Sequence, residues 1–486
     1  MSAGTGGTGR HVVGRHVVVV GAGPAGLAAA DAALAAGARV TLVDSAEQPG
    51  GQYHRMLPDA YEAANPDVLQ HGYNAFEQRS MRVIGHRRST WLADTSVWAI
   101  ERDDPSRAPL VHVLTGGLPR ERRTLRPDAL VLAPGAHDRV LPFPGWELPG
   151  VFTAGAAQAL AKGERVAVGD RVVVAGTGPF LLPVAVSLLE AGSRVVEVLE
   201  AARAASATRG WLRKPWELAA QAGKTGELAS YTAALARERV PYLPGRAVIE
   251  ARGDGRVEEV VSARVRGDWS VVPGTERVTA ADAVCVGHGF TPRLELAVAS
   301  GCELRGSAPA EVFVEVDGEQ RTSAPGVYAA GEVTGIAGAP AARAEGAVAG
   351  WFAAGGDPSA RTLAPLRRAR DQGRAFAERL AHAHPVGREW PGWLRGDTIV
   401  CRCEETDYAA VCAAAGDPVS SEARVARLGT RAGLGPCQGR MCGVTVAELR
   451  ARLGAPDPDP AAPHRRPVAE PIRLAELAAP PAEREG

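Results

Sequence analysis

Five of the seven cysteines of this 486-residue chain lie in one C-terminal stretch. Four of them, Cys401, Cys403, Cys437 and Cys442, follow the spacing Cys-x-Cys-x33-Cys-x4-Cys. Four thiolates suit a [2Fe–2S] cluster or a tetrahedral zinc ion. We expect the cluster, because structural zinc more often uses two Cys-x2–4-Cys pairs. In the first pair here only one residue separates the cysteines. Free thiols are the third reading.

A glycine-rich turn near the N-terminus has the pattern of a dinucleotide-binding site. The β-branched run 16–20 leads into a Gly-x-Gly-x-x-Gly turn and an Ala-rich helix, and a second strand ends in an acid. The glycines permit a tight turn, approach of the backbone to a pyrophosphate and close helix–strand packing, and the acid accepts hydrogen bonds from a ribose. The alternative is a turn without a ligand. The predicted site comprises Gly21, Gly23, Pro24, Ala25, Gly26 and Asp44.

Three further segments indicate that this dinucleotide is FAD. Gly51 and Gln52 follow the second strand, where backbone contact and a hydrogen bond could reach a flavin. Two later strands end in tight turns of the kind found in two-dinucleotide-binding flavoproteins, and the acid of the last turn would contact the ribityl chain. The residues expected there are Ala133, Gly135, Gly331 and Glu332, with Glu332 standing where Asp is commoner.

A second fingerprint begins about 155 residues after the first and is less regular. Gly176 and Gly178 follow a strand, but Leu181 replaces the third glycine. The acid of the next strand, Glu200, comes one place later than the first site predicts. We expect a bound nucleotide here, and three readings remain open: NAD(P)H, a structural adenine nucleotide such as ATP, or a vestigial site.

These motifs together resemble the FAD- and [2Fe–2S]-containing subunits of heteromeric amino-acid and opine dehydrogenases. That family includes the opine oxidase A-type, D-hydroxyproline and L-proline dehydrogenase alpha-type and hydrogen cyanide synthase middle subunits. The most specific matching segments are 173–183, 286–292, 331–338, 401–405 and 431–442. The resemblance implies that a partner flavoprotein subunit oxidises the substrate, while this chain relays electrons through FAD and its cluster. A small ferredoxin-like subunit is a possible further partner of the hetero-oligomer.

The resemblance also implies a glutathione-reductase-like α/β fold with two Rossmann-like domains and a bacterioferritin-associated-ferredoxin-like [2Fe–2S] domain. A second nucleotide-binding domain would then interrupt the FAD domain. The expected parts are a flexible N-terminus 1–14, the FAD domain 15–150 and 285–365, the second domain 151–284, a solvated Arg-rich connector 366–395, the cluster domain 396–455 and a Pro-rich tail 456–486 that is extended, disordered or docked on a partner.

Composition narrows the partners and the compartment. Lys and Arg number 55, as do Asp and Glu, so the zero net charge gives no sign of a nucleic-acid or anionic-membrane surface. The sequence contains no stretch of 18 or more uncharged apolar residues, so no membrane span is predicted. The N-terminus lacks the apolar core of a signal peptide, and cysteines clustered for metal binding suit a reducing compartment, so we expect a cytoplasmic protein.

No set of side chains forms a convincing acid–base pair for substrate chemistry, so the catalytic residues are not predicted. His288, between two glycines, is expected to have a structural or polar-contact role. Trp211, Arg213 and Trp216 would line an interface or an open cleft, or would take part in ordinary packing. Two other functions remain open: an autonomous NAD(P)H-dependent reductase of an external carrier, and a non-catalytic subunit with a structural adenine nucleotide.

Overall fold

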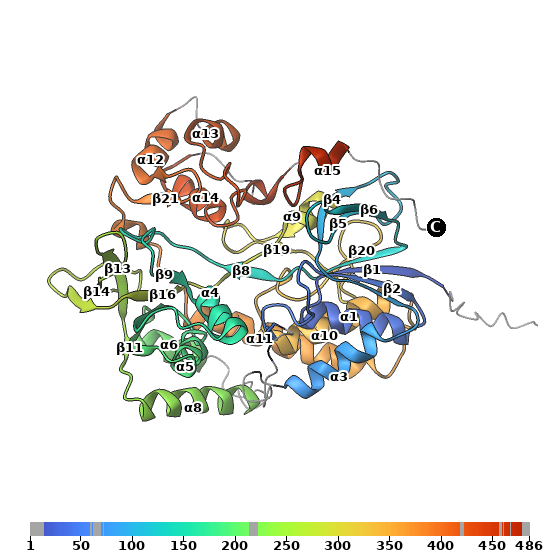
Figure 1. Cartoon of the computed structure of the whole chain (residues 1–486), viewed down its shortest axis with the longest axis horizontal. Coiled ribbons are helices and arrows are strands. Elements are labelled where there is room, and N and C mark those ends of the chain that lie inside the picture. The colour runs from blue at the N-terminus through green and yellow to red at the C-terminus, as the bar shows by residue number, and fades with distance from the viewer. Residues whose placement is uncertain are drawn as a thin grey trace, which may run out of the picture.

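Figure 1 shows two α/β units side by side, with the C-terminal elements above them. The computed structural model describes residues 14–478, apart from 59–60, 62–69, 71, 213–221, 418–421, 456–458, 460 and 467. Residues 1–13 of the expected flexible N-terminus lie outside the described residues, as do Arg213 and Trp216. No helix of the described part is both long and apolar enough to cross a bilayer.

The first unit is built on a five-stranded parallel sheet with the order β20-β7-β1-β2-β3. The four valines of β1 are at most 7 % exposed, because both faces of a parallel sheet are covered. The strands are β1 (His16–Val20), β2 (Arg39–Val43), β3 (Ser89–Leu92), β7 (Ala129–Leu132) and β20 (Val327–Ala329).

Alternate valines of β1 face two different cores. Val17 and Val19 pack with three helices, whereas Val18 and Val20 pack with an antiparallel sheet and short elements on the other face. The helices are α1 (Pro24–Ala35), α3 (Tyr73–Ile84) and α10 (Ala339–Ala353). The opposite layer contains β4 (Thr95–Glu101), β5 (Leu110–Thr115), β6 (Glu121–Leu125), α9 (Glu295–Ala299), β18 (Leu304–Arg305) and β19 (Phe313–Val314).

Glycines bring α1 and α10 into close contact. A Cβ atom on Gly346 would lie 1.9 Å from the carbonyl oxygen of Ala25, and one on Gly350 would lie 1.9 Å from that of Ala29. Any larger residue at either position would push the helices apart. This packing fixes the start of α1, which carries the first glycine turn.

The second unit is a five-stranded parallel sheet with the order β12-β11-β10-β16-β9. Its strands are β9 (Val151–Thr153), β10 (Arg171–Gly176), β11 (Arg194–Glu200), β12 (Tyr242–Pro244) and β16 (Ala283–Gly287). The remaining elements are α4 (Ala154–Ala159), the π-helix η1 (Leu160–Glu164), α5 (Leu181–Glu190), α6 (Ala204–Trp211), α8 (Ala222–Arg237) and an antiparallel sheet of β13 (Arg246–Arg252), β14 (Glu259–Arg264) and β15 (Arg277–Ala280).

The expected boundary between residues 284 and 285 is wrong, because it cuts β16. That strand pairs with β10 along its whole length and belongs to the second sheet. The chain passes between the units through two short strands, β8 (Ala136–Asp138) and β17 (Phe290–Pro292), which pair antiparallel. The second unit therefore continues to Gly287.

The Arg-rich segment is helical and packs more closely than the solvated connector that was expected. Most of it forms α11 (Leu363–Ala383), which packs between α10 and α6. A Cβ atom on Gly373 would lie 2.2 Å from Ala341 Cβ, and one on Gly210 would lie 2.4 Å from Ala383 Cα. Helix α11 thus links the first unit to the second.

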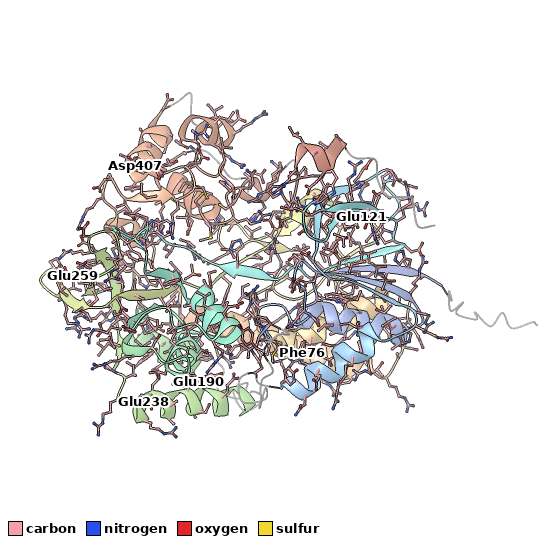
Figure 2. All side chains as sticks on the ribbon, in the orientation of Figure 1. Phe76, Glu121, Glu190, Glu238, Glu259 and Asp407 are labelled. Carbon is pink, nitrogen blue, oxygen red and sulfur yellow. The ribbon has the colours of Figure 1, made fainter. Side chains whose placement is uncertain are left out.

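The C-terminal module packs against the second unit. Trp390 and Trp393 of the short helix η2 (Trp390–Trp393) share a core with Trp269, and the Trp269 and Trp393 rings stack 5.7 Å apart. Asp407, labelled in Figure 2, caps α12 by accepting from the Ala410 backbone N–H at 2.8 Å. The elements are β21 (Ile399–Cys401), β22 (Thr406–Asp407), α12 (Tyr408–Gly416), α13 (Ala423–Thr430) and α14 (Gly443–Arg452).

The described part of the Pro-rich tail packs on the rest of the chain and is not extended in solvent. It contains η3 (Ala462–His464) and α15 (Leu474–Ala478) and lies along the first unit. The Ala469 N–H donates to the Trp98 carbonyl at 2.7 Å, and Arg120 pairs with Glu476 at 2.7 Å. The sequence did not reveal this docking because its partners lie more than 350 residues away.

Candidate functional site

A cavity of about 770 Å³ lies where the two units meet. It is bordered by nearly every residue predicted for the first site, although these come from four separate parts of the chain. Of that set only Gly26 is absent from the wall. The predicted residues in the wall are Gly21, Gly23, Pro24, Ala25, Asp44, Gly51, Gln52, Ala133, Gly135, Gly331 and Glu332.

The three glycines of the first turn have different local tasks. Gly21 has φ +100°, and a Cβ atom on it would lie 2.2 Å from the Ala133 carbonyl oxygen. A Cβ atom on Gly26 would lie 1.6 Å from the Gly21 carbonyl oxygen. Gly23 meets nothing nearer than Gly51 Cα at 3.8 Å. Gly21 and Gly26 therefore build the turn, while Gly23 keeps its open side clear at the N-terminus of α1, where phosphates bind.

Asp44 lies at the end of β2, beside this turn. Its Oδ2 accepts from the Ala22 backbone N–H at 2.5 Å, and its Oδ1 accepts from the Ala46 N–H at 2.8 Å. An ionised carboxylate has about four lone-pair sites. Asp44 lines the cavity, so the acceptor capacity that these two bonds leave suits the vicinal hydroxyls of a ribose.

The turn that carries Gly51 and Gln52 is braced by α3. Phe76, labelled in Figure 2, stacks on His54 with ring centroids 4.4 Å apart and planes 11° apart. Gly51 packs directly on the first turn, because its Cβ position lies 2.9 Å from Gly23 Cα. The backbone of both turns therefore borders the same part of the cavity.

A buried carboxylate that the sequence did not single out braces the last turn. Glu345 on α10 accepts from the Gly331 N–H at 2.9 Å and from the Thr334 hydroxyl at 2.7 Å. Arg374 of α11 donates to the other carboxylate oxygen at 3.1 Å. These contacts fix Gly331 and aim the neighbouring Glu332 at the cavity.

Burial raises the pKa of Glu332 to about 7. In the cofactor-free protein, the folded state therefore holds a proton that an unfolded chain releases near its ordinary pKa of 4.5. The folded state therefore binds more protons than the unfolded chain between pH 4.5 and about 7. The free energy of unfolding falls as the pH rises through this range. We expect Glu332→Gln to stabilise the cofactor-free protein at pH 8 by about 1–3 kcal/mol. The estimate uses about 1.4 kcal/mol per pKa unit, and water in the cavity reduces the effect.

Denaturant unfolding between pH 4.5 and 8 measures this difference. The gain should vanish at the acid end of the range. Glu238→Gln is the matched control, because Glu238 is exposed at the end of α8 and is labelled in Figure 2. Parallel pH profiles for the wild type and Glu332→Gln would contradict this role of Glu332.

Apart from Trp211, the far part of the cavity was not predicted, because separate elements of the second unit supply it. Lys162 lies on the π-helix η1, one turn after Gln158, and burial lowers its pKa. Tyr231 and Glu227 of α8 face the same space, with the Tyr231 hydroxyl donating to Glu227 at 2.8 Å. Trp211 also lines the cavity.

His288 is a packing residue in this structure. Burial lowers its pKa to about 3, so the imidazole is neutral near pH 7. Its ring centroid lies 5.8 Å from that of Trp269. It lies outside the wall of the cavity described above, in keeping with the structural role that the sequence favoured.

A bulge in the second sheet explains the late acid of the second fingerprint. Between Val172 and Val173 the register of β10 against β11 shifts by one residue. Glu200 is therefore paired with Gly176 at the carboxyl ends of the two strands. Asp44 takes the same position beside Gly21. The irregular sequence spacing thus preserves the spatial arrangement.

The acid of the second fingerprint is enclosed in this conformation. The Glu200 carboxylate is 2 % exposed and accepts from the backbone N–H groups of Gly178, at 2.9 Å, and Ala202, at 2.8 Å. Tyr242 donates to it at 3.3 Å, and His384 Nδ1 lies 3.4 Å away. Gly176, Gly178 and Glu200 are absent from the wall of the large cavity. The Glu200 carboxylate is therefore enclosed in this conformation, whereas Asp44 lines the large cavity.

The four clustered cysteines come together as two contacting pairs. Cys401 contacts Cys442, and Cys403 contacts Cys437. The hydrogen bond from the Cys442 thiol is the main reason why the pKa of Cys401 falls to about 5. The Gly433 N–H also donates to Cys401 Sγ at 3.5 Å. Among the described residues, no three ligating side chains converge on one point as a single metal ion requires.

The loop between Cys437 and Cys442 also reaches the large cavity. Arg440 lines the cavity wall, and its Nε lies 3.1 Å from the buried Glu295 carboxylate. Arg466 of the tail lies 3.5 Å from the same oxygen. The cysteine loop, the tail and the first unit are therefore joined by one buried ionic network, which sequence spacing did not reveal.

Comparisons with known proteins identify the family of the chain. The family model described as "Pyridine nucleotide-disulphide oxidoreductase" matches residues 15–346. The opine oxidase A-type subunit of Rhizobium meliloti is 32 % identical over 95 % of this chain and 87 % of its own length. Hydrogen cyanide synthase subunit HcnB of Pseudomonas protegens is 31 % identical over 90 % of this chain and 93 % of its own length.

The crystal structure of L-proline dehydrogenase from P. horikoshii matches the fold with a TM-score of 0.66 at 18 % identity, over 96 % of this chain and 80 % of that one. The resemblance to opine oxidase A-type and hydrogen cyanide synthase subunits is thereby confirmed. So is the Rossmann-like flavoprotein fold. The chain is therefore an oxidoreductase of the pyridine nucleotide-disulphide oxidoreductase family.

Proposed function

We propose that the large cavity binds FAD. Asp44 lines the cavity beside the glycine turn, Gly23 has open space on its Cβ side, and Glu332 lines the cavity as well. Bound FAD supplies chemistry that accepts two electrons and releases them one at a time. The residues of the chain bind it, orient it and exclude water. The FAD domain would comprise residues 15–150 and about 288–365.

We infer that the four cysteines hold a [2Fe–2S] cluster in a C-terminal bacterioferritin-associated-ferredoxin-like domain, residues 396–455. Two iron atoms with two thiolates each match two contacting pairs, whereas one zinc ion needs a single convergent set. The N–H of Gly433 already points at Cys401, and such hydrogen bonds tune cluster potentials. The pairing of the thiols is the observation that supports the cluster over zinc.

The function that we propose is electron transfer within a heteromeric dehydrogenase. A partner flavoprotein subunit would oxidise an amino acid, imino acid or opine, and this chain would relay the electrons. Two relatives that align with nearly the whole chain bear the names of subunits, of opine oxidase and hydrogen cyanide synthase. The single feature that carries the proposal is the Arg440 contact, which joins the cysteine loop to the cofactor cavity. A small ferredoxin-like subunit would complete the complex in the cytoplasm.

The second candidate is an autonomous NAD(P)H-dependent reductase of an external carrier. The family match supports it, because residues 15–346 include the second fingerprint. The closed Glu200 carboxylate opposes it. This candidate requires that NADH or NADPH bleach the flavin of the isolated chain.

Co-expression with any flavoprotein that is encoded by a gene next to this one tests the proposal. We expect the two chains to co-elute as a complex that reduces a dye with one amino acid, imino acid or opine from a panel. The isolated chain should be inactive with every member of that panel. Separate elution of the two chains, or dye reduction by the isolated chain, would contradict the proposal.

A further inference from the structure

We propose that His384 determines the electron donor of this protein, because it holds the second nucleotide site shut against NAD(P)H. The inference rests on the proposed function, in which electrons arrive from a partner subunit. It adds a residue and a mechanism of exclusion. We call three parts together the latch: the Glu200 carboxylate, the His384 imidazole and the C-terminal end of α11.

The carboxylate is the group that a ribose would need. Glu200 occupies the place of Asp44 relative to its glycine turn. Asp44 accepts from two backbone N–H groups, whereas Glu200 has two backbone donors, a tyrosine hydroxyl and an imidazole against it. Ribose hydroxyls would have to displace His384 to reach Glu200.

The imidazole is held in one orientation. The Trp211 indole N–H donates to His384 Nε2 at 3.1 Å. In the neutral ring the proton therefore resides on Nδ1, the atom that lies 3.4 Å from Glu200 Oε2. This Nδ1 is buried without a well-formed hydrogen bond. The latch is thus fixed by Trp211 and only loosely bonded to the carboxylate that it covers.

The end of α11 cannot easily withdraw. Ala383 packs so closely on α6 that a Cβ atom on Gly210 would lie 2.4 Å from Ala383 Cα. Nearer the middle of α11, Arg374 donates to Glu345 of the first unit at 3.1 Å. The ring of His384 is therefore carried by a helix that is fixed at two places.

The site behind the latch keeps nucleotide-binding features. Gly176 has φ +141°, and Gly178 has φ +99° with only His384 Cβ, at 4.0 Å, near its open side. The hydroxyl of Thr177 between them is buried and has no hydrogen-bond partner among the described residues. Removing the imidazole would free an acceptor on Glu200 and leave a hollow beside a preformed glycine turn.

Calorimetric titration of the flavin-loaded protein with NADH, NADPH and ATP tests the latch. We expect the wild type to bind none of them measurably, and His384→Ala to bind at least one at least about tenfold more tightly, or about 1.4 kcal/mol. His382→Ala is the matched control, because that histidine lies on the exposed side of the same helix and bonds to the Glu378 carbonyl. It should behave as the wild type.

A double variant locates the gain. Adding Glu200→Ala to His384→Ala should abolish the new affinity, because the ribose acceptor is then missing. Thermal melting with retained flavin shows that each variant is folded; His384→Gly serves if His384→Ala is not. Tight binding of NADH or NADPH to the wild type, or no gain in the His384 variants, would overturn the latch.

The outcomes separate this inference from the proposed function. NADH that binds the wild type without bleaching its flavin refutes the latch and leaves the electron-transfer role standing. Rapid bleaching by NADH refutes both. If the His384 variants behave as expected but no partner subunit can reduce the chain, the proposed function is refuted and the latch stands.

Discussion

Gly23→Val is expected to abolish FAD binding while leaving the protein folded. Gly23 has φ −74° and ψ −172°, which valine adopts without strain. Its Cβ position meets nothing closer than 3.8 Å, so the two added methyl groups would project into the space where the pyrophosphate approaches. We expect at least a 100-fold loss of affinity, or about 3 kcal/mol.

Flavin absorbance after desalting, together with a thermal melt, measures both parts of this expectation. Gly267→Val is a matched control, because its Cβ position is open and the residue lies in an exposed turn of the second unit. That variant should keep its flavin. If Gly23→Val also retained FAD at the wild-type ratio, the assignment of the first cavity would fail.

Cys437→Ser should remove the [2Fe–2S] visible absorption and leave FAD in place. Serine oxygen is a harder ligand than thiolate and suits iron–sulfur clusters poorly. One iron would keep a single thiolate, because Cys437 pairs with Cys403. We expect iron per chain to fall from about two toward zero.

Cys412→Ser provides the comparison for that experiment. Cys412 is half-buried on α12 and is not one of the four paired thiols. Iron and visible absorption should be unchanged in this variant. Unaltered iron content in Cys437→Ser, or equal loss in both variants, would refute the proposed ligands.

Much of the first site could be predicted because it is local. The turn from Gly21 to Gly26, the helix after it and Asp44 form one continuous βαβ stretch, and each residue type has a steric or hydrogen-bonding reason. Glu332 was also predictable, since it ends a buried strand followed by a glycine-rich turn. The relative position of these segments followed from the family's fold.

What the sequence did not reveal depends on contacts between distant segments. The register shift at Val172 and Val173 decides where Glu200 lies. The acid comes one place late in the sequence, but that spacing alone does not show that a bulge corrects it. The place of α11 depends on single glycines such as Gly373 that let helices touch. Arg440 looked like an ordinary residue of the cysteine loop until the fold paired it with Glu295.

We propose that electrons enter through a partner subunit and then pass between FAD and the cluster in this chain. Anaerobic mixing with the substrate of the complex, followed by optical and electron paramagnetic resonance spectra, tests it most directly. We predict flavin bleaching and a reduced [2Fe–2S] signal in the complex, and neither in the isolated chain. Reduction of the isolated chain by the substrate, or a complex whose cluster stays oxidised, would contradict the account.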